Sequence, residues 1–177
     1  MFILEAERNK DPIDSFYRYR KYLEDNHDRF PSAAYALATS DWYFDLRCHE
    51  CPHDAWLEWA RVDEHSLGER HEIRSVAITI KLLGAYHDGT IEIYYPKVFE
   101  YRIISLALDK GHREWRYDEL RLNEKGHLIH EIEWNGCQDN GSWFIVASEV
   151  EFKWTPFQRD PKMRCNGREE NRCMTPG

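Results

Sequence analysis

Cysteine and histidine gather in one short stretch of the chain, at spacings typical of metal ligands. Cys48 and Cys51 stand three residues apart, and His53 follows two residues later. Two thiolates at this spacing can share one tetrahedral zinc ion, with a histidine nitrogen as a further ligand. A closed structural site would need a fourth ligand, from Cys165 or Cys173. The alternatives are a redox pair and ordinary reduced thiols in a loop, and we expect the thiols and no cofactor.

Histidines beside carboxylates form a second set of chemical candidates. His87 and Asp88 precede Gly89 in a turn-like stretch, and His130 and Glu131 lie in a strand-like one. A histidine oriented by a carboxylate can act as a general base. However, neighbours in a strand point to opposite faces, and His130 shares its face with apolar residues. We therefore predict no catalytic residue and keep these four residues as candidates for a ligand or enzyme pocket.

Other signatures of chemistry are missing, and the charge narrows the classes of partner. The sequence has no GxGxxG, GxxxxGK or GxSxG motif. Net charge is −8, and residues 48–157 carry 20 acidic and 12 basic groups. Phosphate neutralisation needs basic side chains, so the sequence predicts no direct nucleic-acid binding. It instead favours a cationic protein partner, with charge kept only for solubility as the plain alternative.

The sequence shows neither a membrane helix nor a signal peptide, and both observations bear on where the protein resides in the cell. No stretch approaches the ~20 apolar residues of a membrane helix, and the apolar run after Met1 is too short for a signal peptide. Five cysteines are an odd number, so reduced thiols are expected rather than a disulfide framework. The sequence therefore predicts a cytoplasmic protein without a membrane partner.

The elements that would position these side chains are predicted to be mainly strands. In residues 75–98, SVAITIKLLGAYHDGTIEIYYPKV, apolar side chains alternate on both sides of a His-Asp-Gly turn, which predicts a hairpin with one buried face. Similar patterns, separated by glycine-containing turns, predict strands at 55–62, 72–83, 90–95, 98–108, 116–122, 127–134 and 142–154. Short connections favour antiparallel pairing of successive strands. We expect a meander sheet curled as a half-barrel or folded as a sandwich.

Helices are expected only near the N-terminus. Asp11 and Pro12 are typical of a helix start, and Phe16, Tyr19 and Leu23 follow at helical spacing. A second, short helix is expected at 33–38. The fold class is thus α+β, mainly β. Residues 1–157 are expected to form one domain, with a helical part at 1–47 and a β part at 53–156, and residues 158–177 a flexible polar tail.

The chain also resembles known proteins over its β part. Residues 75–98 and the stretch DELRLNEKGHLIHEIEW at 118–134 resemble a group of small bacterial β-rich proteins of uncharacterised function, over roughly residues 53–156. That resemblance implies no activity or catalytic residue. Size, acidity and aromatic content resemble the immunity proteins of bacterial toxin systems, which implies a basic toxin domain as the partner.

We therefore expect a non-enzymatic protein-binding module, in its sharper form an immunity protein that covers a cationic toxin surface. Exposed aromatic residues ringed by carboxylates would provide anchors and electrostatic steering. The candidate contact residues are Trp56, Glu58, Trp59, Glu92, Tyr94, Glu131 and Glu133. The alternative is a small-ligand-binding protein or enzyme with a pocket in the curled sheet.

Overall fold

The helices and strands follow the expected order along the chain. A computed structural model describes residues 1–4, 10–104, 111–135 and 141–158. Its elements are α1 (Pro12–Asp25), a 3₁₀ turn η2 (His27–Arg29), α2 (Ser32–Ala38), β1 (Trp56–Leu67), β2 (Ile73–Leu83), β3 (Gly89–Ile104), β4 (Trp115–Leu122), β5 (Leu128–Trp134), β6 (Ser142–Ala147) and β7 (Glu151–Pro156). The α+β, mainly β prediction is confirmed. Within the described ranges, no helix has the length and apolar character to span a membrane.

In the described part of the chain, one antiparallel sheet contains all seven strands. The order is β1-β2-β3-β6-β5-β4, and β7 pairs with the first half of β3. Two three-stranded meanders, β1-β2-β3 and β4-β5-β6, are therefore joined through the β3–β6 pair, so the order is not sequential throughout. The sheet is not closed, although an isolated bridge between Trp56 and Glu114 brings the two edge strands together at one end. Because the described strands all belong to one sheet, the sandwich alternative is excluded for them.

The strand boundaries differ from expectation at two places. The range 90–95 and the described part of the range 98–108 merge into the single strand β3, which continues through Pro96 with a register irregularity beside it. Residues 105–108 of the expected strand lie outside the described residues. The range 142–154 instead divides into β6 and β7 around Glu149. The Glu149 carboxylate accepts hydrogen bonds from the backbone N–H of Ala34 and Ala33, at 3.0 and 3.4 Å. Glu149, which separates β6 from β7, thus caps the N-terminus of α2, because α2 has no side-chain cap from its own N-cap residue.

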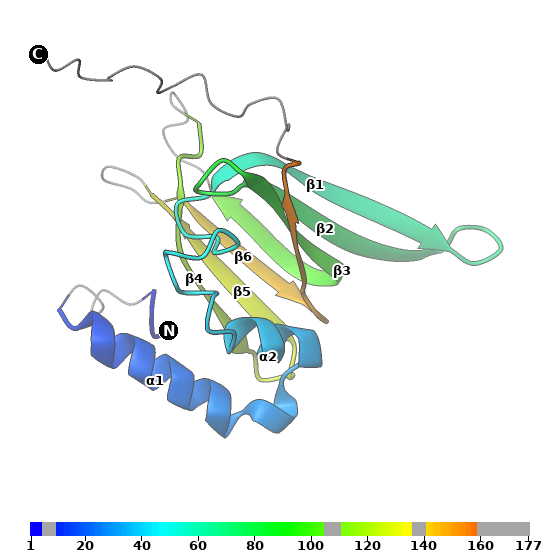
Figure 1. Ribbon diagram of the computed structural model, residues 1–177. Coiled ribbons are helices and arrows are strands. Elements are labelled where there is room, and N and C mark those ends of the chain that lie inside the picture. Colours follow the sequence, from blue (N-terminus) through cyan, green and yellow to red (C-terminus); the bar gives the residue numbers. More distant parts are fainter. Residues whose placement is uncertain (5–9, 105–110, 136–140, 159–177) are drawn as a thin grey trace, which may run out of the picture.

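Helix α1 packs on the core and also covers the edge of β4. Its start is as expected, because Asp11 accepts a hydrogen bond from the Asp14 N–H and a proline occupies the first turn. The buried Tyr19 hydroxyl donates to the Leu120 carbonyl and accepts from the Leu120 N–H, at 3.0 and 2.8 Å. Backbone groups that an edge strand would leave open are therefore paired by a helix side chain. Figure 1 shows α1 and α2 together at one side of the sheet.

At the opposite side of the molecule, β1 and β2 extend beyond the other strands (Figure 1). β2 pairs with β3 only from Val76 onward, so residues 65–75 form a two-stranded arm. Leu67 and Ile73 in this arm have 62% and 57% of their surface exposed. A two-stranded hairpin is only marginally stable by itself, so the arm depends on the sheet that carries it. Nearly all of the expected tail lies outside the described residues.

Candidate functional site

His130 occupies the interior of the protein, in a hydrogen-bonded network with four other side chains. Its Nε2 lies 2.9 Å from Asp118 Oδ2, and the Tyr95 hydroxyl lies 2.6 Å from its Nδ1. Asp118 also accepts hydrogen bonds from the Tyr43 hydroxyl at 2.7 Å and the Trp115 indole N–H at 2.9 Å. Every polar atom named here is satisfied when Nε2 donates to Asp118 and the Tyr95 hydroxyl donates to Nδ1.

This network is sealed from solvent. None of its five residues has more than 3% of its surface exposed, and each comes from a different strand or loop except the two on β4. Burial, followed by the charge of Asp118, raises the pKa of Tyr43 and Tyr95 well above the ordinary phenol value, so both remain hydrogen-bond donors. A substrate has no access to His130. The arrangement resembles a catalytic triad in composition, but its geometry is that of a fully satisfied core network.

His87 and Asp88 lie at the β2–β3 turn. There they contact residues of β1 and of the loop that precedes β1. Asp88 Oδ2 lies 2.5 Å from Nδ1 of His49, a contact that spans 39 residues of sequence. The His49 ring stacks on Tyr86 with 4.2 Å between ring centroids and 14° between planes. The Tyr86 hydroxyl donates to the Leu46 carbonyl at 3.0 Å. Tyr86 is thus fixed at its hydroxyl and across its ring, although it remains 50% exposed.

Trp56 also lies beside this turn and, like Tyr86, packs against a histidine ring. Its ring meets the ring of His87 edge to face, with 5.0 Å between centroids, and half of the tryptophan surface is exposed. His87 itself has φ of +55°, a left-handed conformation that the tight turn requires. We call the five residues His49, Trp56, Tyr86, His87 and Asp88 the turn cluster. It presents two exposed aromatic rings, each supported by a histidine ring.

The cysteines near the turn cluster are not arranged as a metal site. Cys51 is buried and donates its thiol hydrogen to the Tyr43 carbonyl at 3.1 Å, and burial raises its pKa to about 12. Burial, with Asp45 and other nearby carboxylates, also raises the pKa of Cys48. His53 lies 3.2 Å from Asp54. In the described ranges no three Cys, His, Asp or Glu side chains are grouped as metal ligands, and Cys165 and Cys173 lie outside those ranges.

Other predicted contact residues share the outer face of β1, β2 and β3, which points away from the core. Trp59 pairs with Lys81 across the strands, and Lys81 pairs with Glu92, which in turn pairs with Lys153. Lys81 also forms an ion pair with Glu58 at 3.1 Å. Tyr94 lies on the same face, since it alternates with buried neighbours. Lysines thus stand among the carboxylates here, and this face is less acidic than the sequence suggested.

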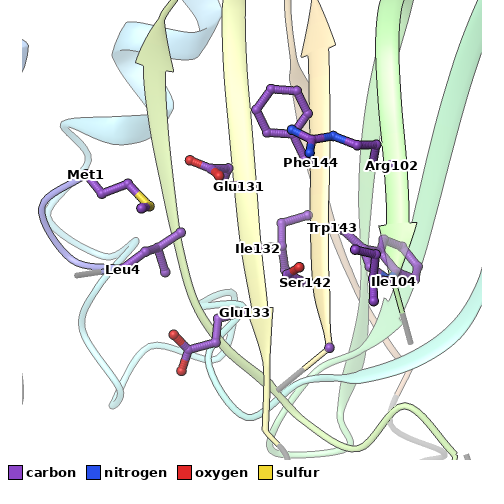
Figure 2. Close-up of a pocket in the computed structure, with 11 residues that line it drawn as sticks. Met1, Leu4, Arg102, Ile104, Glu131, Ile132, Glu133, Ser142, Trp143 and Phe144 are labelled. Carbon is purple, nitrogen blue, oxygen red and sulfur yellow. The ribbon is translucent and has the colours of Figure 1, made fainter. Parts of the chain in front are cut away.

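Glu131 and Glu133 lie on β5, at the opposite half of the sheet. Arg121 forms ion pairs with both Glu131 and the buried Glu119. The two glutamates line a cavity of about 240 Å³ over β5, β6 and the end of β3. Figure 2 shows Met1 and Leu4 on one side of this cavity and Arg102 and Ile104 on the other, with the glutamates between. The structure therefore separates this pair from the turn cluster.

The N-terminal residues reach this half of the sheet because Glu119 binds their backbone. Its carboxylate Oε2 accepts hydrogen bonds from the N–H groups of Phe2 and Ile3 at 2.8 Å and of Leu4 at 3.4 Å. Glu119 and Ile3 are both completely buried. A buried carboxylate is costly unless it is hydrogen-bonded and paired, and here three N–H groups and Arg121 meet that need.

The structure thus brings together residues that the sequence assigned to different hypotheses. Trp56 was expected to bind a partner and His87 and Asp88 to line a pocket, yet all three belong to the turn cluster. Sequence reasoning missed Tyr86 and the His49 contact. Tyr86 directly precedes the His-Asp-Gly turn, so its position could have been noticed in the sequence. The contact between His49 and Asp88 spans 39 residues and leaves no local signal. Comparisons with models of protein families, with curated proteins and with solved structures found no match.

Proposed function

We propose that this protein is a non-enzymatic binding module for a basic protein partner, and that the turn cluster anchors that partner. The observation that carries the proposal is the support of two exposed aromatic rings, Trp56 and Tyr86, by His87 and His49. Tryptophan and tyrosine are enriched among residues that dominate binding energy. Rings that are fixed before binding lose little conformational freedom when a partner covers them, which favours affinity.

Charge around the turn cluster supports a basic partner. Residues 41–58 carry five carboxylates and one arginine, and the whole chain has a net charge of −8. That arginine, Arg47, is already engaged by Asp45, whose pKa it lowers to about 2. A negative potential of this kind raises the association rate of a positively charged protein and is screened by salt. In its sharper form, the proposal is an immunity protein that neutralises a cationic toxin domain in the cytoplasm.

The sealed core network is consistent with a binding role. Two buried side chains with acid–base chemistry, His130 and Asp118, are hydrogen-bonded to each other and to buried neighbours. The alternative proposal, a small-molecule site, draws on a different place, the cavity beside Glu131 and Glu133. It is tested by a thermal-shift screen of charged metabolites against wild type and Glu133→Gln, in which a shift seen only with wild type supports it.

Affinity capture with matched variants tests the main proposal. The full chain is immobilised and exposed to lysate of its source organism at low and high salt. We expect one basic protein to bind wild type at low salt, to be released by salt, and to be lost with Trp56→Ala or Tyr86→Ala. Tyr17→Ala is the matched control, because Tyr17 is an exposed tyrosine on α1. Capture that is unaffected by the two turn-cluster variants, or no capture at either salt, contradicts the proposal.

A further inference from the structure

β1 is the outermost strand of the sheet, and it remains exposed where a neighbouring strand would cover it. Among the described residues, its strand contacts are β2 along one edge and the single bridge at Trp56 on the other. Val62 is 44% exposed, although its cross-strand partner Ile78 is fully buried. Trp59 is 39% exposed. An edge of this kind can pair with another strand through its backbone, unless charges or bulges prevent it.

The charges on β1 favour one register and disfavour its neighbours. Arg61 and Asp63 lie on the same face, with Arg61 Nε 2.7 Å from Asp63 Oδ2. In an antiparallel pair of two identical strands, a two-fold axis at Val62 places Arg61 opposite Asp63 of the other copy. Moving the axis to Arg61 places two arginines opposite each other, and moving it to Asp63 places two aspartates opposite each other. Like charges in directly opposed positions are unfavourable.

We propose that two copies of this chain pair edge to edge through β1, antiparallel and centred on Val62. The two arginines and two aspartates then form a ring of alternating charge on the outer face. Trp59 of each copy lies opposite His65 of the other, and Val62 lies opposite its own counterpart. A register irregularity between Leu57 and Trp59 ends the regular strand on one side, so the pairing extends over residues 59–65. The turn cluster lies beyond this range.

The size of the contact predicts a weak dimer. Seven residues of strand span about 24 Å, which is a small interface by the standards of stable complexes. We therefore expect association in the micromolar range or weaker, visible as a concentration dependence and stronger at low salt. The proposal concerns the chain alone, so it does not depend on the partner of the turn cluster.

Charge exchange between Arg61 and Asp63 tests this register. Sedimentation equilibrium of the full chain is measured at low salt from micromolar to millimolar concentration. Arg61→Asp and Asp63→Arg each place like charges opposite one another twice, and we expect each to weaken dimerisation about tenfold or more. The double variant exchanges the two charges, restores opposite pairs, and is expected to recover wild-type association. Thermal unfolding of each variant confirms that it is folded.

The outcomes of this experiment distinguish a β1 edge that pairs with a second copy from one whose charges prevent such pairing. If the charges on β1 only prevent association, wild type is monomeric at every concentration, which overturns the proposal. Dimerisation that is unchanged in both single variants, or that the double variant fails to recover, also overturns it. Recovery in the double variant supports this register specifically, because no general effect of surface charge distinguishes the double exchange from wild type.

Discussion

The buried carboxylate of Asp118 gives the sharpest test of what holds this fold together. Asp118→Asn keeps the shape of the side chain but replaces one acceptor oxygen by a donor NH₂ group. If the remaining oxygen faces Tyr43 and His130, the NH₂ group opposes the Trp115 N–H, which donates to Asp118 at 2.9 Å in wild type. One hydrogen bond to a charged acceptor is then lost, and two buried donors, the Trp115 N–H and the new NH₂ group, face each other without an acceptor. We expect the free energy of unfolding to fall by about 3 kcal/mol.

Urea unfolding followed by tryptophan fluorescence measures this loss, because Trp115 is itself part of the network. For a chain of this size the melting temperature should fall by roughly 6–12 °C. Glu124→Gln is the control, since Glu124 lies in an exposed turn, and it should change stability by less than about 0.5 kcal/mol. If Asp118→Asn is equally harmless, the network is not a source of stability and the reasoning is refuted.

Three further predictions follow from burial and capping. Because burial raises the pKa of Cys51 to about 12 and that of Tyr95 well above its ordinary value, the folded state keeps protons that the unfolded chain loses. Stability should therefore fall as pH rises above about 9 for Cys51 and above about 10 for Tyr95, by about 1.4 kcal/mol per pH unit for each group. Tyr95→Phe should reduce the slope above about pH 10 in urea titrations at pH 8–11. Glu149→Ala should remove the cap of α2 and cost about 1 kcal/mol by the same assay, whereas an unchanged midpoint would mean that water replaces the cap. Cys51 should react with a thiol reagent only on unfolding, while Cys48, which is half-buried, should react in the native state; equal rates would contradict the burial of Cys51.

The sequence predicted the strands well because period-two alternation is a local signal. The hairpin of residues 75–98 and the helix start at Asp11 were both confirmed. The joining of β3 to β6 was not predicted, because the choice between β4 and β6 as neighbour of β3 depends on non-local pairing. The same limit applies to Glu149, which looks like an ordinary strand residue until its contact with α2 is seen.

The candidate site was predictable only in pieces. The turn position of His87 and Asp88 could be read from turn chemistry, whereas which aromatic residues are exposed, Trp56 among them, was known only from the structure. Their meeting with His49 required the fold. His130 was correctly placed on the apolar face of its strand, but Asp118 was not expected to be its partner. A buried aspartate in an otherwise charged stretch, DELR, gives no local sign that it points inward.

The binding of α1 to the edge of β4 has a consequence for synthesis on the ribosome. Tyr19 and Tyr22 meet Leu120 and Leu122, partners that follow them by 101 and 100 residues. At about 5–20 residues per second, the helix waits roughly 5–20 s for its partner strand to be made. A helix of 14 residues is marginal in water by itself. During that interval its aromatic face is open to chaperones, and that face is covered only after β4 has left the exit tunnel.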